Sequence, residues 1–311
     1  MFSFFISRFK KTNSRFYIII TIICISLFTL SKILITNHFF LLKQNIKQIN
    51  QNNQNKNQDD NYNQDNNIIY VEPQEAFKEI LFSGYFNNFN ETDMKVRKCD
   101  NMEKCEEMYK NNLVEFNNDN KKELERLIKL CNEKINKYKS LYDITWKLCK
   151  TTKKLEEGMP HTHTDIIFLS DNFFRTNNDE SKMITLIHEK LHVYQRKYKE
   201  KTEELYNKYN FSKVKKKNIN LRRTNPDLDS YDYNYNGVLI YSEYKDNARS
   251  LRDVDTKFIS IESKTNKEKK EIEELAKNGY QNEHPNEIFA SIISEKIVNN
   301  NLNEKLSDYI K

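Results

Sequence analysis

Two stretches of the chain carry the hydrophobic spacing of amphipathic helices. Residues 120–138 place their apolar side chains on one stripe, formed by Leu124, Leu127, Ile128, Cys131 and Ile135. Residues 181–198 predict a longer helix whose buried side comprises Ile184, Ile187, Leu191, Tyr194 and Tyr198. A last helix is predicted from Pro285 or Asn286 to about Val298, because proline is favoured in the first helical turn.

Short apolar runs between these helices predict strands. One strand is expected within residues 144–151, which read ITWKLCKT, and a second within residues 165–170, which read DIIFLS. The segment Gly158-Met-Pro160 separates the two runs. Residues 212–282 are charged and irregular, so we expect a long loop-rich insertion there. The expected fold class is therefore α+β, with a small mixed sheet.

An uncharged apolar run near the N-terminus predicts a membrane anchor. Residues 16–36 supply the roughly 20 apolar residues that cross a bilayer, provided that Lys32 reaches the interface. Residues 1–15 are basic and contain no acidic residue, which places the N-terminus in the cytoplasm and the rest of the chain on the other side. Secretion after signal cleavage is the alternative, but no small-residue cleavage site follows the run.

The chain after the anchor divides into two parts. Residues 37–67 are rich in Asn and Gln and predict a disordered tether. Residues 68–311 form a single predicted domain. The whole chain has 51 Lys+Arg against 45 Asp+Glu, and no basic stripe is interleaved with aromatic residues, so we expect no nucleic-acid partner. Two disulfides or four buried thiols are both compatible with the cysteines beyond the anchor, Cys99, Cys105, Cys131 and Cys149.

The motif that carries chemistry is His188-Glu189-Lys190-Leu191-His192, an HExxH within the predicted helix 181–198. Residues four apart lie on one face of a helix, so both imidazoles can bind one metal ion. Glu189 lies beside them, where its carboxylate can take a proton from a metal-bound water. Zinc would lower the pKa of that water and polarise a scissile carbonyl. The alternative is a pair of surface histidines on an amphipathic helix.

A catalytic zinc needs a third protein ligand and an open position. Gln195 and Tyr198 occupy the Gly and His positions of the HExxHxxGxxH subtype, which excludes it. The remaining candidates are Glu200, Glu203, Glu204, Glu243, Glu283 and Glu287. We favour Glu287, because the helix dipole stabilises its charge in the first turn and the small Ala290 and Ser291 share its face. The alternative is an acid that only stabilises the helix dipole.

The pair HEKLHVYQR and HPNEIFASI resembles the gluzincin metallopeptidases, in which a downstream helix supplies a glutamate ligand. The resemblance covers residues 144–297. It implies a zincin-like domain with active-site helices and one zinc per chain. It also implies that His188, His192 and Glu287 bind the zinc, that Glu189 acts as general base and acid, and that the substrate is a peptide or protein.

The segment GMPHTHTDIIFLS also resembles the active-site edge strand of such enzymes. We expect residues 165–169 to pair with an extended substrate. The candidate substrate contacts are His161, His163, Asp165 and Ile167, although His161 and His163 can also be loop histidines without a role. Candidates for stabilising an oxyanion are Tyr231, Tyr241 and His284.

The segment Asn225–Tyr231 is rich in carboxylates. Its acids could orient a zinc-binding imidazole or bind calcium, but the segment lacks the Gly and closing Glu of an EF-hand loop. A solvated turn is the favoured interpretation.

Two functions of different classes follow from these residues. The first is zinc-dependent hydrolysis of peptide bonds, with a zinc hydrolase of non-peptide amides or esters as a variant. The second is a non-catalytic zincin-fold membrane protein, in which a fourth protein ligand such as His163 or His284 closes the zinc site.

Overall fold

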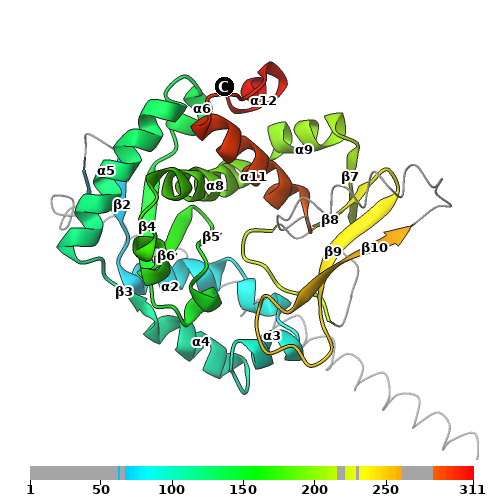
Figure 1. Cartoon of the computed structure of the whole chain (residues 1–311). Coiled ribbons are helices and arrows are strands. Elements are labelled where there is room, and N and C mark those ends of the chain that lie inside the picture. The colour runs from blue at the N-terminus through cyan, green and yellow to red at the C-terminus, as the bar shows by residue number, and fades with distance from the viewer. Residues whose placement is uncertain (1–61, 64–66, 216–220, 229–230, 261–282) are drawn as a thin grey trace, which may run out of the picture. The chain divides into compact units, whose positions relative to one another are not determined.

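The computed structural model describes residues 62–63, 67–215, 221–228, 231–260 and 283–311, which form a mixed α+β fold with two sheets (Figure 1). The described helices are α2 (Pro73–Phe82), α3 (Glu91–Val96), α4 (Met102–Asn111), α5 (Asn118–Ile135), α6 (Lys139–Tyr142), α7 (Asp171–Arg175), α8 (Asp179–Lys197), α9 (Lys199–Lys208), α11 (Pro285–Val298) and α12 (Glu304–Ile310). Short 3-10 turns are η1 (Tyr85–Asn88) and η2 (Leu155–Gly158). The described strands are β1 (Tyr62–Asn63), β2 (Ile68–Tyr70), β3 (Leu113–Val114), β4 (Trp146–Thr151), β5 (His161–His163), β6 (Ile166–Ser170), β7 (Phe211–Lys215), β8 (Tyr231–Tyr235), β9 (Val238–Tyr244) and β10 (Val254–Ser260).

The first sheet contains both predicted strands, as β4 and β6. Its order is β1-β2-β4-β6-β5, with β3 paired to one end of β4. β2, β4 and β6 are parallel, whereas β5 runs antiparallel to β6 and forms one edge of the described sheet. A small mixed sheet is therefore present, as the sequence predicted.

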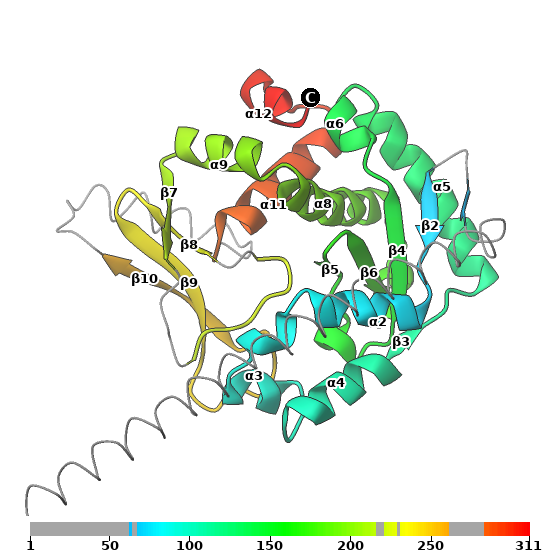
Figure 2. The ribbon, with the colours of Figure 1, turned by 180° about the vertical axis from the view of Figure 1, so that it is seen from behind.

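Successive side chains of this sheet face two different apolar layers, as the period of two requires. On β6, Ile167 and Leu169 pack with α5 and α8, while Ile166 and Phe168 pack with α2 and α4. Figure 2 shows these two pairs of helices on opposite faces of the sheet. The sheet is thus buried on both sides, which explains the nearly continuous apolar run in DIIFLS.

The three predicted helices are present as α5, α8 and α11. All five apolar residues of the predicted stripe on α5 are buried. α8 starts after Asn178, whose side chain accepts a hydrogen bond from the backbone N–H of Ser181 at 3.0 Å. α11 starts with Pro285 after His284, whose Nδ1 accepts a hydrogen bond from the N–H of Asn286 at 3.1 Å. The positions of these caps agree with the boundaries expected from the sequence.

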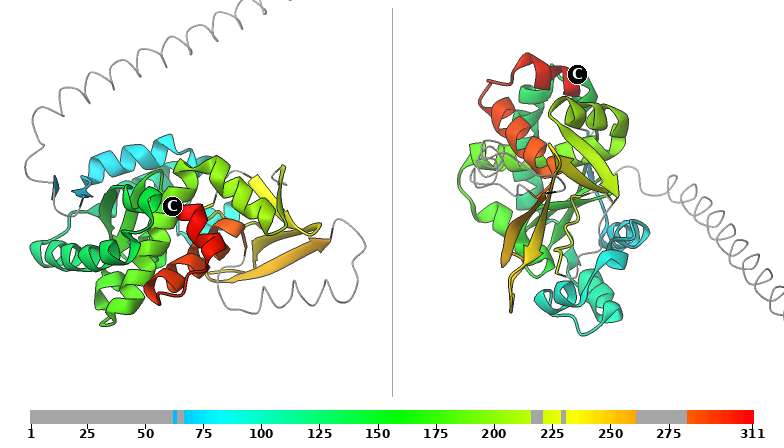
Figure 3. Two further views of the ribbon diagram at one scale, coloured as in Figure 1. Left: turned by 90° about the horizontal axis from the view of Figure 1, so that it is seen from above. Right: turned by 90° about the vertical axis from the view of Figure 1, so that its right-hand side faces the viewer.

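The prediction of a loop-rich insertion over residues 212–282 is wrong for its described part. β7, β8, β9 and β10 form a second, antiparallel sheet of order β10-β9-β8-β7, which Figure 3 shows beside α9 and α11. Asn236 (φ 48°) and Gly237 (φ 78°) make a two-residue turn between β8 and β9. An Asn-Gly pair is a strong hairpin signal, because both residues tolerate positive φ. The aromatic residues of β8 and β9 supply strand-forming side chains on either side of the turn.

The membrane anchor expected at residues 16–36 and most of the expected tether lie outside the described residues. No helix in the described part of the chain is both long and apolar enough to cross a bilayer. All four cysteines beyond the anchor region are buried free thiols, so the structure contains four thiols and not the two disulfides that the sequence also allowed.

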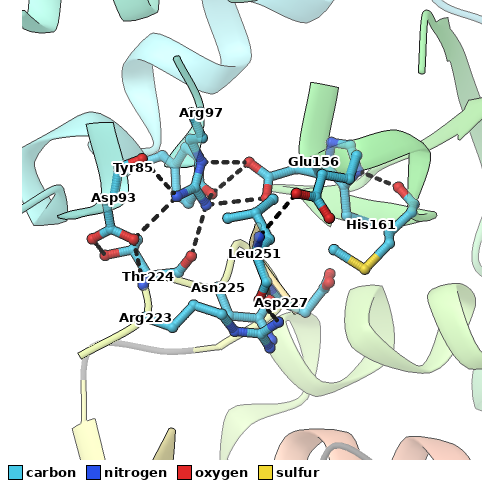
Figure 4. A network of polar contacts seen from close by, with 12 residues as sticks. Tyr85, Asp93, Arg97, Glu156, His161, Arg223, Thr224, Asn225, Asp227 and Leu251 are labelled. Carbon is cyan, nitrogen blue, oxygen red and sulfur yellow. Dashed lines mark hydrogen bonds and ion pairs between the residues drawn. The ribbon is translucent and has the colours of Figure 1, made fainter. Parts of the chain in front are cut away.

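A buried polar network connects the N-terminal helices to the segment before β8 (Figure 4). The guanidinium of Arg97 lies 3.0 Å from Asp93 Oδ1 and 3.0 Å from Glu156 Oε2, and it donates to the carbonyl of Thr224 at 2.9 Å. Glu156 adopts a left-handed φ of 44°, which is unusual for a residue other than glycine. Burial opposes ionisation of Glu156, but the charges of Arg97 and His161 and the hydrogen bonds from Tyr109 and Arg97 together outweigh burial and hold the pKa of this carboxyl below its ordinary value.

We expect Arg97→Met to destabilise the protein by about 3–5 kcal/mol, because it leaves two buried carboxylates without their cation. Arg126→Met is the matched control. Arg126 also pairs with an aspartate, Asp179, but both side chains are about half exposed, so its loss should cost less than about 1 kcal/mol. Urea unfolding of the three proteins measures both values, and equal losses would contradict the proposed importance of the network.

Candidate metal centre

The two histidines of the HExxH motif face one carboxylate from α11. His188 Nε2 and His192 Nε2 lie 2.9 Å apart on one face of α8. Glu287 Oε2 lies 3.3 Å from His188 Nε2 and 3.6 Å from His192 Nε2. The structure therefore brings together the three residues that the sequence selected as ligands.

These distances fit a small tetrahedral metal ion. Donor atoms bound at about 2.0–2.1 Å in a tetrahedron are separated from one another by about 3.3–3.4 Å. The observed separations of 2.9, 3.3 and 3.6 Å bracket that value. Two imidazoles and a carboxylate are also a donor set that zinc accepts. The residues present thus fit the ion that the resemblance implies.

The remaining glutamate candidates do not join this group among the described residues. Glu203 accepts from the hydroxyl of Tyr233 at 2.7 Å, and Glu283 pairs with Arg223. Glu287 reaches the two histidines because α11 packs on α8, and Ala290 in the next turn of α11 is small and fully buried.

Both oxygens of the Glu287 carboxylate have defined surroundings. Oε1 accepts a hydrogen bond from Asn225 Nδ2 at 2.9 Å, and Oε2 faces the two imidazoles. Burial of Glu287 would raise its pKa. The neighbouring His192 and His188 outweigh burial and lower the pKa well below its ordinary value. An ionised carboxylate is the form that binds a cation.

In both histidines the other ring nitrogen, Nδ1, also has a partner. His192 Nδ1 lies 2.9 Å from Gln195 Oε1, and Gln195 Nε2 donates to the carbonyl of Asn286 at 2.9 Å. The amide nitrogen of Gln195 is used by the carbonyl of Asn286, and its oxygen can only accept, so Nδ1 of His192 is the donor in the contact with Gln195. Nε2 of His192 then keeps a free lone pair that can bind a metal. His188 Nδ1 lies 3.4 Å from Ser291 Oγ. From the sequence, Gln195 was only a departure from the HExxHxxGxxH pattern, and Ser291 only a small residue on the face of Glu287.

Glu189 lies within the same site and is 4 % exposed. Its Oε2 is buried and has no hydrogen-bond partner among the described residues. Burial raises the pKa of Glu189 well above its ordinary value, and the charges of Asp227 and Glu287 add to that effect. A buried carboxylate oxygen without a partner is available to accept a proton from a bound molecule.

Asp227 is a further acid at the site, and the interpretation of its segment as a solvated turn is wrong at this residue. It is buried, with one oxygen atom within 4.8 Å of donor atoms of Glu189 and His192. Its Oδ1 accepts hydrogen bonds from both the N–H and the hydroxyl of Thr162, each at 2.7 Å. In the sequence, only the number of acidic residues in 225–231 drew attention to Asp227, and that number does not show that Asp227 is buried.

The expectation that residues 165–169 form the edge strand is also wrong. β6 is hydrogen-bonded to β4 on one side and to β5 on the other, so its main chain is not free to pair with a substrate. Ile167 is buried in the core, and Asp165 is an exposed residue that pairs with Lys147 at 2.7 Å. Neither side chain joins the metal group or the cleft beside it.

His161 and His163 lie on β5 and project to one side, as expected for residues two apart. Their side chains pack on Phe168, at centroid distances of 5.2 and 5.4 Å, on the face of the sheet covered by α2 and α4. Thr162 between them faces α8 and accepts a hydrogen bond from Arg196. The two histidines therefore point away from the metal group.

Two cavities lie near this site. A cleft of about 530 Å³ is lined by His188, Glu189, Asp227 and Glu287. A second cavity of about 400 Å³ contains the three residues considered for the oxyanion, Tyr231, Tyr241 and His284. None of these three lines the cleft at His188 within the described part of the chain.

Comparison with protein-family models, with curated proteins and with solved structures found no match to this chain. The chemistry of the site is therefore inferred from its own residues.

We expect zinc to bind in a 1:1 ratio and to raise the melting temperature, because it binds the folded chain and not the unfolded chain. At a free zinc concentration of 1,000 times the Kd, the free energy of unfolding should rise by about 4 kcal/mol. Glu287→Gln should abolish most of this gain. Glu204→Gln, an exposed glutamate on α9, is the control and should retain it. Calorimetric titration and thermal unfolding with added zinc measure both effects, and a full gain in Glu287→Gln would remove Glu287 from the site.

We expect acid to destabilise the protein partly through His163. Burial, together with the charges of His161 and Arg196, holds the pKa of His163 well below its ordinary value of 6.5. The unfolded chain then binds more protons than the folded chain below about pH 6.5, so stability falls by up to about 1.4 kcal/mol per pH unit as the pH decreases.

His163→Phe should remove this part of the pH dependence. The measurement is urea unfolding of both proteins at pH 8 and pH 5, and the stability difference between the two pH values should be smaller in the variant. An unchanged difference would show that His163 titrates normally in the folded protein.

Proposed function

We propose that the chain is a zinc-dependent metallopeptidase with a zincin-like fold, similar to the gluzincins. The observation that supports this most directly is the convergence of His188, His192 and Glu287 within 3.6 Å, with Glu189 beside them. The α+β fold with an antiparallel strand at one edge of its mixed sheet is consistent with it.

The charge of the site also supports a bound cation. Glu189, Asp227 and Glu287 are all at most 6 % exposed and lie close together. Arg196 pairs with Asp227 at 3.9 Å, whereas the carboxylate of Glu287 faces two imidazoles. Several buried carboxylates without matching cations are strongly unfavourable. A divalent ion among them would balance most of their charge.

In this proposal the protein holds the ion with neutral imidazoles and one carboxylate, and Glu189 moves the proton. Zinc, when bound, would activate a water and polarise the scissile carbonyl. Glu189 Oε2 would take a proton from the attacking water and return it to the leaving nitrogen. Its burial raises its pKa above the ordinary value, and its Oε2 has no partner among the described residues, so this oxygen is placed to receive a proton and to pass it on.

The non-catalytic alternative requires a fourth protein ligand. His163 faces the opposite side of the sheet, and His284 Nδ1 caps α11. Neither belongs to the metal group among the described residues. The proposal of an enzyme therefore has the stronger support.

For the whole chain we propose a single-pass membrane protein anchored by residues 16–36. The N-terminus would lie in the cytoplasm and the hydrolase domain on the opposite side, with peptide or protein substrates and no nucleic-acid partner.

We expect Glu189→Gln to lower peptide hydrolysis by at least about 100-fold, because an amide cannot take the proton, while one zinc per chain is retained. Glu204→Gln, the exposed glutamate on α9, is the control and should behave like the wild type. Cleavage of a random-sequence peptide library by the full-length chain, followed by mass spectrometry, measures hydrolysis. Equal cleavage by metal-free protein would overturn the mechanism.

A further inference from the structure

The segment of residues 223–227 crosses the site and separates the two cavities described above. Asp227 binds Thr162 on β5, Arg196 on α8 donates to the carbonyl of Pro226 at 2.8 Å, and Asn286 on α11 donates to the carbonyl of Asp227 at 3.1 Å. Asp227 lines the cleft at His188, whereas Pro226 lines the cavity on the other side. We call residues 223–227 the crossing segment.

The crossing segment is firmly held by the buried network of Figure 4. Asp93 accepts from the N–H of Thr224 at 3.0 Å and from its hydroxyl at 2.8 Å, and Arg97 donates to the carbonyl of Thr224. Asn225 donates to Glu287 at 2.9 Å. A buried network with this many hydrogen bonds restricts the movement of the segment. The crossing segment is therefore a permanent end of the cleft.

This end of the cleft affects how an extended peptide can bind. Pairing with the sheet edge would use the N–H of Thr162, but that N–H already donates to Asp227 Oδ1 at 2.7 Å. β5, α8 and α11 are all joined to the crossing segment by hydrogen bonds at this point. A substrate can therefore enter from the open cleft but cannot continue past Asp227.

The closed end carries two carboxylates, those of Asp227 and Glu189, and one arginine, Arg196, which lies 3.9 Å from Oδ1 of Asp227. Oδ1 of Asp227 is used by Thr162, while the residue lines the cleft next to Glu189, whose buried Oε2 has no partner among the described residues. These two carboxylates would attract a cationic group and repel the carboxylate terminus of a peptide. The α-amino group of a peptide is largely protonated at neutral pH.

The spacing within a peptide matches this arrangement. Its α-amino nitrogen and its first carbonyl carbon are two bonds apart, or about 2.5 Å. Asp227 offers an oxygen within 4.8 Å of a nitrogen of His192. An amine bound at Asp227 would thus hold the first peptide carbonyl next to the metal group.

We infer that the chain is an aminopeptidase, in which Asp227 binds the free α-amino group of the substrate; this inference rests on the proposed function. The first peptide C–N bond breaks. The carbonyl carbon takes the oxygen of water and leaves as the carboxylate of a single amino acid. The nitrogen takes a proton by way of Glu189 and becomes the new α-amino group.

The test compares matched peptides on the full-length chain with zinc, namely one peptide with free ends, its N-acetylated form and its C-amidated form. The free and C-amidated peptides should lose residues one at a time from the N-terminus, and the N-acetylated form should be cleaved at least tenfold more slowly. Asp227→Asn should lower kcat/KM for the free peptide on the order of 10- to 100-fold. Asp246→Asn, an exposed aspartate, is the control.

A binding measurement separates substrate recognition from catalysis. A dipeptide analogue with a ketomethylene group in place of its amide should bind the wild type more tightly than Asp227→Asn, and N-acetylation should remove that difference. Zinc content and melting temperature establish that Asp227→Asn is folded.

Cleavage at internal bonds, or equal cleavage of the acetylated peptide, would overturn the inference and leave the proposed function intact. Faster cleavage by Asp227→Asn would also overturn it, since Asp227 would then block the site. No cleavage of any peptide by the zinc-loaded wild type would overturn the proposed function itself, and the inference with it.

Discussion

The contact between α8 and α11 is the constraint on which the site depends. It brings one carboxylate and two imidazoles from distant parts of the chain to within 3.6 Å, inside an apolar layer. Such a group is costly to bury unless each polar atom has a partner. The side chains of Gln195, Ser291 and Asn225 bind the outer atoms of these ligands, so that the remaining donor atoms point at one another.

A second buried system, centred on Arg97, supports the site from the opposite side. It joins α3 and η2 to Thr224, only a few residues before Asp227. The N-terminal helices therefore contribute to the site without supplying a residue to it. Their arrangement also explains why an arginine and two acids occupy the interior, where apolar residues are otherwise the rule.

The errors of the sequence analysis have a common cause. Residues 165–169 were expected to form an edge strand from their resemblance to the active-site strand of gluzincins, yet β5 pairs with β6 on the side opposite β4. The aromatic strands β8 and β9 were hidden by the charged residues around them. The segment at Asp227 resembled a solvated turn because nothing local shows that Thr162 and Asn286 cover it. Each of these features depends on partners far away in the chain.

The sequence by itself determined what local spacing controls. The helical period places His188, Glu189 and His192 on one helix, and the Pro285 start with small residues after it identified Glu287 as a partner. Only the tertiary structure decided that Asp227 is buried beside Glu189, that His161 and His163 face the other layer, and that the crossing segment closes one end of the cleft. Those outcomes follow from strand pairing and helix packing between distant residues, and such contacts leave no periodic signal in a single sequence.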